Sequence, residues 1–217
     1  MTPYVLALDL GPAADFTALA VLQREANEPR TLAVRHLRRF PPGTPYAAVG
    51  EAVGATVRDG GLGHPPLVAD LTAVGSRLLP SLRDAVRPAW VVPVVLTAGQ
   101  TPAKDADGIR RVPKRDLVTN LQLHLQERRL LVAPALPDAA ILVRELTTFR
   151  AKVTLAETES LDWRERPSDD LVLAVALAGW WAAEYPPGGG GLIGEGDTEL
   201  TELLDRLFPE IRRPFPW

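Results

Sequence analysis

The chain has 217 residues, of which 46% are hydrophobic and 24% charged, and these proportions are typical of one globular domain, or of one domain with a short appendage. It contains no cysteine and only three scattered histidines, which excludes disulfides, zinc–thiolate sites and a cysteine nucleophile; any metal would need oxygen ligands, which favours Mg²⁺ or Mn²⁺. The net charge of −3 lacks the basic excess common in nucleic-acid-binding proteins, and no apolar run is long enough to suggest a membrane span.

The first forty residues predict three β-strands joined by short turns. The predicted strands are Tyr4–Leu10, Phe16–Glu25 and Thr31–Phe40. The first is apolar almost throughout, which is typical of a central strand that is buried on both faces. The third alternates only in part between apolar and polar residues, which indicates an edge position. The short turns predict an antiparallel meander.

After Pro41 the pattern changes to helices that alternate with strands. Helices are predicted over Tyr46–Arg58, Val74–Val86, Lys114–Glu127 and Asp138–Phe149, and extended segments over Pro65–Leu71, Trp90–Thr97 and Arg129–Leu136. Pro93 implies a bulge or an edge position in its strand. The polar stretch Ala98–Val112 predicts a mobile loop, and Ala151–Arg166 a hairpin or an irregular excursion.

One more helix precedes a change of composition near the C-terminus. Ser168 suits the N-cap of a helix over Asp169–Glu184, and two aspartates suit the positive end of its dipole. Pro186–Gly191 is typical of a linker, and a short acidic helix is predicted over Thr198–Phe208. We therefore predict one domain over 1–185, a linker and helical tail over 186–217, and an α/β fold. Its mixed sheet would be antiparallel at first, then parallel, and flanked by helices.

Four aspartates stand at positions that need an explanation. Asp9 lies late in an apolar strand and Asp70 ends another, and an ionised aspartate is rarely buried without a partner or a metal. Carboxylates at the C-terminal ends of strands project into the crevice where α/β proteins bind ligands, and Asp169 and Asp170 open a helix that could face it. Together they could hold two divalent ions about 3.5–4 Å apart, as in two-metal phosphodiesterases.

Each of these aspartates also has a structural interpretation when it is taken alone. Asp9 and Asp70 each stand before a turn, where a turn-forming aspartate is as good an explanation as a ligand. For Asp169 and Asp170, helix capping is the better explanation. Only the joint arrangement favours a metal site that cuts nucleic acid.

Four segments between Tyr4 and Tyr185 carry motifs in a fixed order. They are ALDLGPAADFTALAVL with Asp9, Gly11, Asp15, Thr17 and Ala18; VADLTAVGSRLLPSL with Asp70, Thr72, Val74 and Gly75; RRVPKRDLVTNLQLHLQERRLLV with Val112, Pro113, Lys114 and Leu117; and SDDLVLAVALAGWW with Asp169, Asp170, Leu171 and Val172. In this order they resemble the nuclease domain of phage terminase large subunits, which belongs to the RNase H-like superfamily of two-metal nucleases.

The resemblance implies an RNase H-like fold and a Mg²⁺- or Mn²⁺-dependent endodeoxyribonuclease. It implies that two ions are held by Asp9, Asp70 and the pair Asp169 and Asp170, without deciding between the two members of the pair. It also suggests that Lys114 lies near the site, where it would contact a phosphate or modulate metal binding. A surface lysine at the start of a helix explains Lys114 equally well.

The resemblance extends to neighbouring residues and to partners. Asp15 and Thr17 are expected to fix the hairpin, and Glu145 to have a structural role. The implied partners are double-stranded DNA and a packaging ATPase, a small terminase subunit or a portal, in the cytoplasm of a bacterial host and away from membranes. The chain has no G-x-x-x-x-G-K-[ST] phosphate loop, so we expect that it does not translocate DNA by itself. Ser168 stands where members of the family often have Gly or His.

Three other functions are compatible with parts of the sequence. A structure-selective nuclease of the same superfamily, such as a Holliday-junction resolvase or an RNase H, would use the same carboxylates. LALDLG followed by Thr17 also resembles the phosphate-binding hairpin of actin-like ATPases, but no second Asp-Gly-Thr motif follows. The third is a catalytically idle DNA-binding or assembly module, for which the tail EIRRPFPW would serve as a docking peptide.

Overall fold

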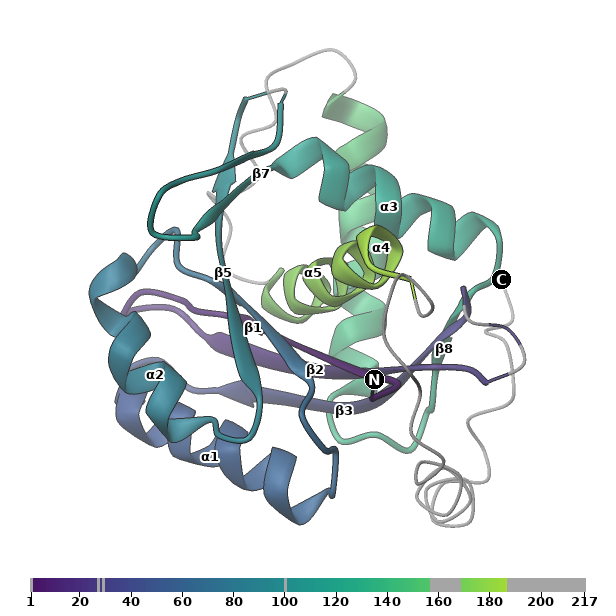
Figure 1. Cartoon of the computed structure of the whole chain (residues 1–217). Helices are drawn as coiled ribbons and strands as arrows, with labels where there is room; N and C mark the ends of the chain where they lie inside the picture. The colour runs from purple at the N-terminus through teal and green to yellow at the C-terminus, as the bar shows by residue number, and fades with distance from the viewer. Residues whose placement is uncertain (1, 27, 29, 100, 157–168, 187–217) are drawn as a thin grey trace.

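The computed structural model describes residues 2–26, 28, 30–99, 101–156 and 169–186, and the side chain of residue 150 and those of 151–156 are not described. The centre of the described part is an eight-stranded sheet with the strand order β6-β7-β5-β4-β1-β2-β3-β8 (Figure 1). The strands are β1 (Tyr4–Asp9), β2 (Thr17–Arg24), β3 (Leu32–Phe40), β4 (Pro66–Asp70), β5 (Trp90–Thr97), β6 (Ala103–Lys104), β7 (Arg110–Pro113) and β8 (Leu130–Val132).

The sheet is antiparallel in its first part and parallel in its second. β1, β2 and β3 form an antiparallel meander, whereas β4 is parallel to β1, β5 to β4 and β7 to β5. β8 is parallel to β3, and β6 is antiparallel to β7. The predicted mixed sheet is confirmed, including the antiparallel start.

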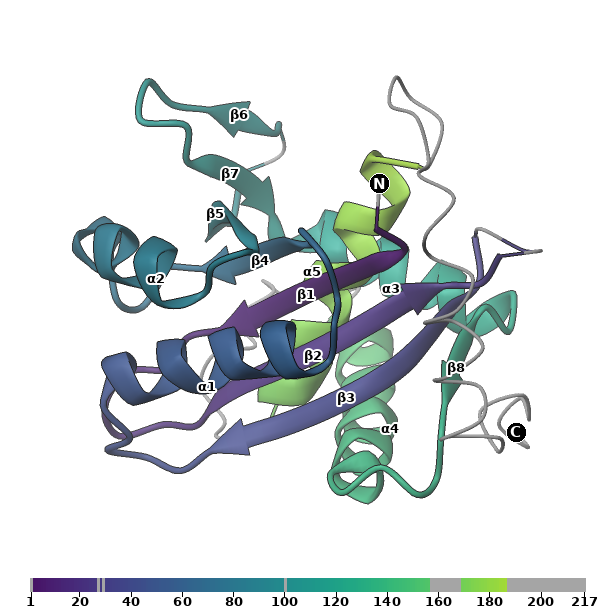
Figure 2. The same ribbon diagram turned by 60° about the horizontal axis from the view of Figure 1, so that its bottom comes forward.

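Helices cover both faces of the sheet. α1 (Tyr46–Asp59) and α2 (Leu79–Ala85), which follows the 3-10 turn Ser76–Leu78, lie on one face. α3 (Lys114–Gln126), α4 (Ala139–Ala156) and α5 (Asp170–Glu184) lie on the other (Figures 1 and 2). α5 packs against β1 and β2 and is enclosed by α3 and α4, which is why it is apolar nearly all round.

The alternation of side chains along the strands separates two apolar layers. Val5 and Ala7 of β1 pack in the layer that contains α5, whereas Leu6 and Leu8 pack in the layer that contains α1 and α2. The same alternation continues in β4, where Val68 lies in the α5 layer. The face to which any strand residue points therefore follows from its position in the strand.

Two predictions about strands were wrong. β3 is not the edge strand, because β8 pairs with its first residues, Leu32–Val34. The stretch predicted as the mobile loop Ala98–Val112 contains β6 and most of β7. These strands are short and have few apolar residues, so their pairing with β5 leaves no periodic signal in the sequence. Pro93 lies in β5 before Val94, where the described ladder with β7 begins, in agreement with an edge position.

Three predicted helix boundaries were also wrong. Val74–Val86 is not one helix, because Gly75, at φ 76°, precedes a 3-10 turn and the shorter helix α2. α4 continues through 151–156, where a hairpin or an irregular excursion was predicted. Asp169 is the N-cap residue of α5, so the helix begins one residue later than predicted. Two segments lie outside the described residues: 157–168, which includes Ser168, and 187–217, which includes most of the predicted linker and the predicted helix and tail.

None of the helices in the described part of the chain is long and apolar enough to cross a membrane.

Candidate metal centre

Asp9 and Asp70 end two neighbouring parallel strands and are partners in the register of β1 and β4. Asp9 follows Val5 and Ala7 at intervals of two residues and Asp70 follows Val68 in the same way, so both carboxylates point to the face of the sheet that α5 covers. Their exposed fractions are only 9% and 3%. Two carboxylates therefore lie side by side in a largely buried place at the C-terminal edge of the parallel strands.

Thr72 holds the carboxylate of Asp70 in place. Oδ1 of Asp70 accepts the backbone N–H of Thr72 at 2.8 Å and the hydroxyl of the same residue. The hydroxyl oxygen of Thr72 in turn accepts the N–H of Leu96 in β5 at 2.8 Å. The interpretation of Asp70 as a turn-forming aspartate is therefore correct, and the turn also fixes the carboxylate relative to the next strand.

The connection between β1 and β2 is held just as closely. Thr17 accepts the N–H of Gly11 at 3.2 Å, and the hydroxyl of Tyr46 donates to the carbonyl oxygen of Gly11 at 2.9 Å. A Cβ atom at Gly11 would lie 2.0 Å from the carbonyl oxygen of Phe16, so only glycine fits. Asp15 donates its N–H to Pro12 in the same turn. Thr17 and Asp15 thus take part in the hairpin, as expected.

The start of α5 lies over the row of strand residues that contains Asp9. Arg39 of β3 pairs with Ala18 of β2, and Ala18 pairs with Asp9 of β1. Nη2 of Arg39 donates to Oδ2 of Asp170 at 2.7 Å, and both side chains are 15% exposed. Asp169, 5% exposed, precedes Asp170 as the N-cap residue. The helix start and the two strand carboxylates therefore share one edge and one face of the sheet.

Glu145 of α4 caps the first turn of α5. Its Oε2 accepts the backbone N–H groups of Leu171 and Val172 at 3.0 and 3.1 Å. The side chain is 4% exposed, and this burial raises the pKa of Glu145 to about 7 although both hydrogen bonds oppose the rise. Burial also raises the pKa of Asp170, against the effect of Arg39. The expected structural role of Glu145 is therefore that of a helix cap.

The donor atoms at this edge fit a hard divalent cation. Within the described ranges, no three acidic or histidine side chains lie close enough together to hold a metal ion. Asp9 and Asp70 do lie together, and Mg²⁺ is usually bound by one or two carboxylates completed by water and substrate phosphates. The structure therefore brings two of the four predicted ligands together, and places Asp169 and Asp170 on the same face without joining them to that pair.

One basic side chain, Lys114, lies at the same end of the sheet, and further basic residues lie in the hairpin that precedes it. Lys114 begins α3 directly after β7, whose last residue pairs with the last residue of β5 at the C-terminal edge. In the β6–β7 hairpin (Figure 2), Lys104 and Arg110 are cross-strand partners, an arrangement of like charges that is unfavourable by itself. Arg110 lies over the rings of Trp181 and Tyr185, 5.2 Å from each centroid.

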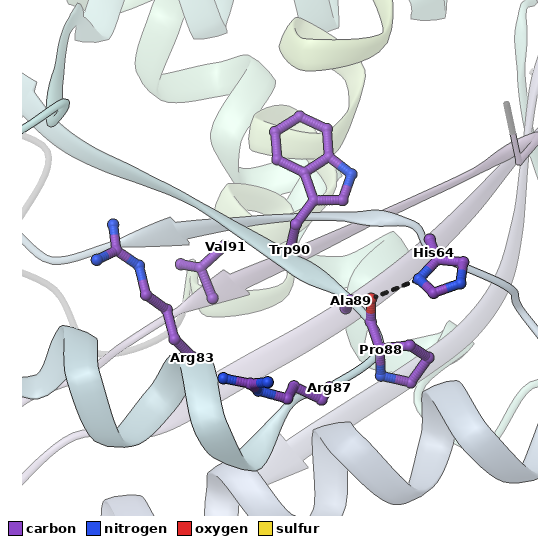
Figure 3. A pocket seen from close by; sticks show the side chains of 7 residues that line it. All are labelled: His64, Arg83, Arg87, Pro88, Ala89, Trp90 and Val91. Atoms are coloured by element: carbon purple, nitrogen blue, oxygen red, sulfur yellow. Dashed lines mark hydrogen bonds between the residues drawn. The ribbon is translucent and has the colours of Figure 1, made fainter.

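A surface hollow of about 480 Å³ lies at the opposite edge of the sheet (Figure 3). It is lined by His64, Arg83, Arg87, Pro88, Ala89, Trp90 and Val91. Trp90 pairs with Pro66 at the start of β4. Asp70 ends the same strand, and four residues of strand place it about 13 Å from Pro66. Arg83 and Arg87 lie beside Val91, while the ring of Trp90 points to the other side of the strand. This hollow is therefore separate from the two carboxylates.

Comparison with known proteins gave matches to solved structures alone. No protein-family model and no curated protein matches the chain. The large terminase nuclease from thermophilic phage G20c, with bound zinc, is 22% identical over 82% of this chain and 80% of that chain, with a TM-score of 0.51. A lysine-to-alanine mutant of gp2c, from the large terminase subunit of bacteriophage Sf6 with calcium, is 14% identical over 82% and 88%, with a TM-score of 0.53. The chain has the RNase H-like fold of large terminase nucleases.

The terminase-like fold agrees with the order of the motifs in the sequence. The segment that contains Asp9 forms the β1–β2 hairpin, the segment that contains Asp70 forms β4 and the turn after it, and the segment that contains Lys114 forms β7 and α3. The pair Asp169 and Asp170 stands at the start of α5. Sequence reasoning missed Arg39 as a partner of Asp170, because nothing in a single sequence links β3 to a helix so far along the chain.

Proposed function

We propose that the protein is a Mg²⁺- or Mn²⁺-dependent endonuclease that hydrolyses phosphodiester bonds in double-stranded DNA, with a role in viral or prophage DNA packaging. The observation that carries this proposal is the pairing of Asp9 with Asp70, two buried carboxylates on adjacent parallel strands. Burial of two like charges side by side is unfavourable unless a cation compensates them. The terminase-like fold supports the nature of the reaction.

Asp9 and Asp70 would hold the divalent ion, with water and a DNA phosphate completing its coordination. A bound ion of this kind supplies an activated water and stabilises negative charge on the leaving oxygen. Thr72 keeps the Asp70 carboxylate oriented, so little reorganisation is needed when the cation arrives. Lys114, at the same edge, would contact a phosphate of the substrate.

Asp169 is the proposed ligand from α5, and Asp170 has a structural role. The carboxylate of Asp170 is bound to Arg39 at 2.7 Å, and this ion pair ties the helix start to β3. Asp169 stands at the N-cap but makes no capping hydrogen bond to the helix. A second ion between Asp169 and the strand carboxylates would complete the two-metal arrangement that the sequence predicts.

DNA would be held through its phosphates rather than through its bases. Lys104 of β6, Arg111 of β7 and Arg115 of α3 are exposed on the segments that lead up to Lys114 or follow it. Contacts of lysine and arginine with phosphates fix a duplex without reading its sequence and weaken as salt increases. A packaging ATPase, a small terminase subunit or a portal in the cytoplasm of a bacterial host would present the DNA.

Cleavage of supercoiled plasmid with Mg²⁺, Mn²⁺ or chelator tests this proposal. Asp70→Ala should abolish metal-dependent nicking and keep the circular dichroism spectrum of the folded protein. Asp84→Ala is the matched control, because Asp84 is an exposed aspartate on α2 that forms an ion pair with Arg87 and is not one of the proposed ligands. Full activity of Asp70→Ala would refute the proposal.

Two further comparisons refine the same assay. Asp169→Asn should lose cleavage, whereas Asp170→Asn should keep a measurable part of it. The opposite order would contradict the proposed roles of the two residues. A strong preference of the wild-type protein for branched DNA or for an RNA–DNA hybrid over linear duplex would identify a structure-selective nuclease instead.

A further inference from the structure

The N-terminus of α5 is capped by a side chain from another helix. An aspartate at an N-cap normally accepts the N–H groups of the second or third helical residue through its own carboxylate. In α5 the N-cap residue is Asp169, and the N–H groups of Leu171 and Val172 instead donate to Glu145 of α4. The usual local cap has therefore been replaced by a distant one.

This replacement is an expensive way to stabilise a helix. The side chain of Glu145 is buried in the apolar layer beside Leu142 and Leu146. Its second oxygen, Oε1, is buried and has no hydrogen-bond partner among the described residues. Asp169, which is 5% exposed, is already buried at this position, and a cap by its own carboxylate would satisfy the same N–H groups without burying a second one. Helix stability alone therefore does not account for Glu145.

The consequence of the distant cap is that Asp169 is not used for capping. Glu145 occupies the N–H groups that would otherwise turn the Asp169 carboxylate back onto its own helix, and Arg39 holds the neighbouring Asp170 by an ion pair. The two contacts fix the first turn of α5 from α4 and from β3. The backbone of Asp169 is thereby held over the edge where Asp9 and Asp70 lie.

We propose that Glu145 is a positioning residue which, by capping α5 in place of Asp169, keeps the Asp169 carboxylate from turning onto its own helix and so lets it serve as a ligand of the divalent metal. This inference rests on the proposed nuclease function. Glu145 itself does not contact metal or substrate in this scheme. It acts through the position of Asp169, as outer-shell partners of metal ligands commonly do.

Mn²⁺ titration calorimetry of the full chain tests this inference without measuring cleavage. Glu145→Ala should weaken Mn²⁺ binding by roughly 10- to 100-fold, because mutation of outer-shell partners commonly has such an effect. Glu145→Gln should stay close to wild type, because an amide oxygen can accept both N–H groups. Hydrogen exchange should show that the amides of Leu171 and Val172 lose protection in the alanine variant and keep it in the glutamine variant.

Arg24→Met is the matched control for a general loosening of α5. Nη2 of Arg24 donates to the carbonyl oxygens of Ala182 and Tyr185, so this variant weakens the same helix at its other end. It should lower the stability of the protein and leave Mn²⁺ affinity unchanged. Glu145→Met, which keeps the bulk of the side chain, replaces the alanine variant if the cavity left by alanine prevents folding.

The possible results separate this inference from the proposed function. Wild-type affinity for Mn²⁺ in a folded Glu145→Ala or Glu145→Met protein would overturn the inference, and so would a loss in Glu145→Gln as large as that in Glu145→Ala. If Arg24→Met lowers the affinity for Mn²⁺ as much as Glu145→Ala does, the effect comes from helix stability alone, and the inference is also overturned. If Asp70→Ala binds Mn²⁺ as well as wild type does, the proposed function itself fails.

Discussion

Replacing Glu145 by glutamine should remove a loss of stability that the wild-type protein suffers as the pH rises. Burial raises the pKa of Glu145 from 4.5 to about 7, so the folded protein keeps this proton over a range in which the unfolded chain releases it. The stability contributed by the protonated carboxyl is fully present below pH 4.5, declines as the pH rises through this range, and is lost above the folded pKa.

The size of the effect follows from the two pKa values. One unit of difference corresponds to about 1.4 kcal/mol. Between 4.5 and about 7 the free energy of unfolding of the wild-type protein therefore falls by about 3 kcal/mol through this one group. Glutamine at position 145 accepts the N–H groups of Leu171 and Val172 at every pH, so the variant lacks this contribution.

Urea unfolding at pH 5 and at pH 8 measures the prediction. The loss of free energy of unfolding between these conditions should be about 2–3 kcal/mol larger in wild type than in Glu145→Gln. Asp170, whose pKa burial also raises, is present in both proteins, so its own titration largely cancels in the comparison. Equal losses in the two proteins would show that Glu145 is not held in a desolvated place and would refute the reasoning.

Three further substitutions test contacts that hold the site. Gly11→Ala should destabilise the protein by at least about 1–3 kcal/mol, because the added Cβ would lie 2.0 Å from the carbonyl oxygen of Phe16. The loss should appear as a lower melting temperature, and an unchanged melting temperature would contradict the prediction. Thr72→Val removes the hydroxyl that donates to Asp70, so it should lower the free energy of unfolding in urea by about 1–3 kcal/mol and slow DNA cleavage. Cleavage at the wild-type rate would show that this turn does not orient the carboxylate. Arg24→Met should cost about 1.5–3 kcal/mol in urea through lost hydrogen bonds to the end of α5, with cleavage by the folded protein unchanged; a loss of cleavage would link that end to the site.

Local patterns predicted most of the elements that carry the site. The apolar runs that end at Asp9 and Asp70 are short-range signals, so β1 and β4 were predicted within a residue or two. The helix that opens with Asp169 and Asp170 was predicted for the same reason. β7 was missed, because its four residues are extended through pairing with β5 and not through any periodicity of their own.

The sequence does not choose between Asp169 and Asp170 as a metal ligand. Both residues are aspartates at a helix start, and both suit the helix dipole equally well. The contact that distinguishes them is the ion pair of Asp170 with Arg39, two residues that are 131 positions apart in the chain. Turn formation and metal binding at Asp70 likewise seemed to be alternatives in the sequence, and the structure combines an Asx turn at Asp70 with its place beside Asp9.

Carboxylates that end two apolar strands and open a long apolar helix can be recognised from the amino-acid sequence, because burial and periodicity show in neighbouring residues. The sequence also excluded cysteine ligands and favoured a cation held by oxygen atoms. The folded structure is needed to see that Asp9 and Asp70 are partners in one register and that Glu145 caps α5 in place of Asp169. Strand pairing and helix packing join residues that are far apart in the chain, and no local pattern specifies which of many possible partners will meet.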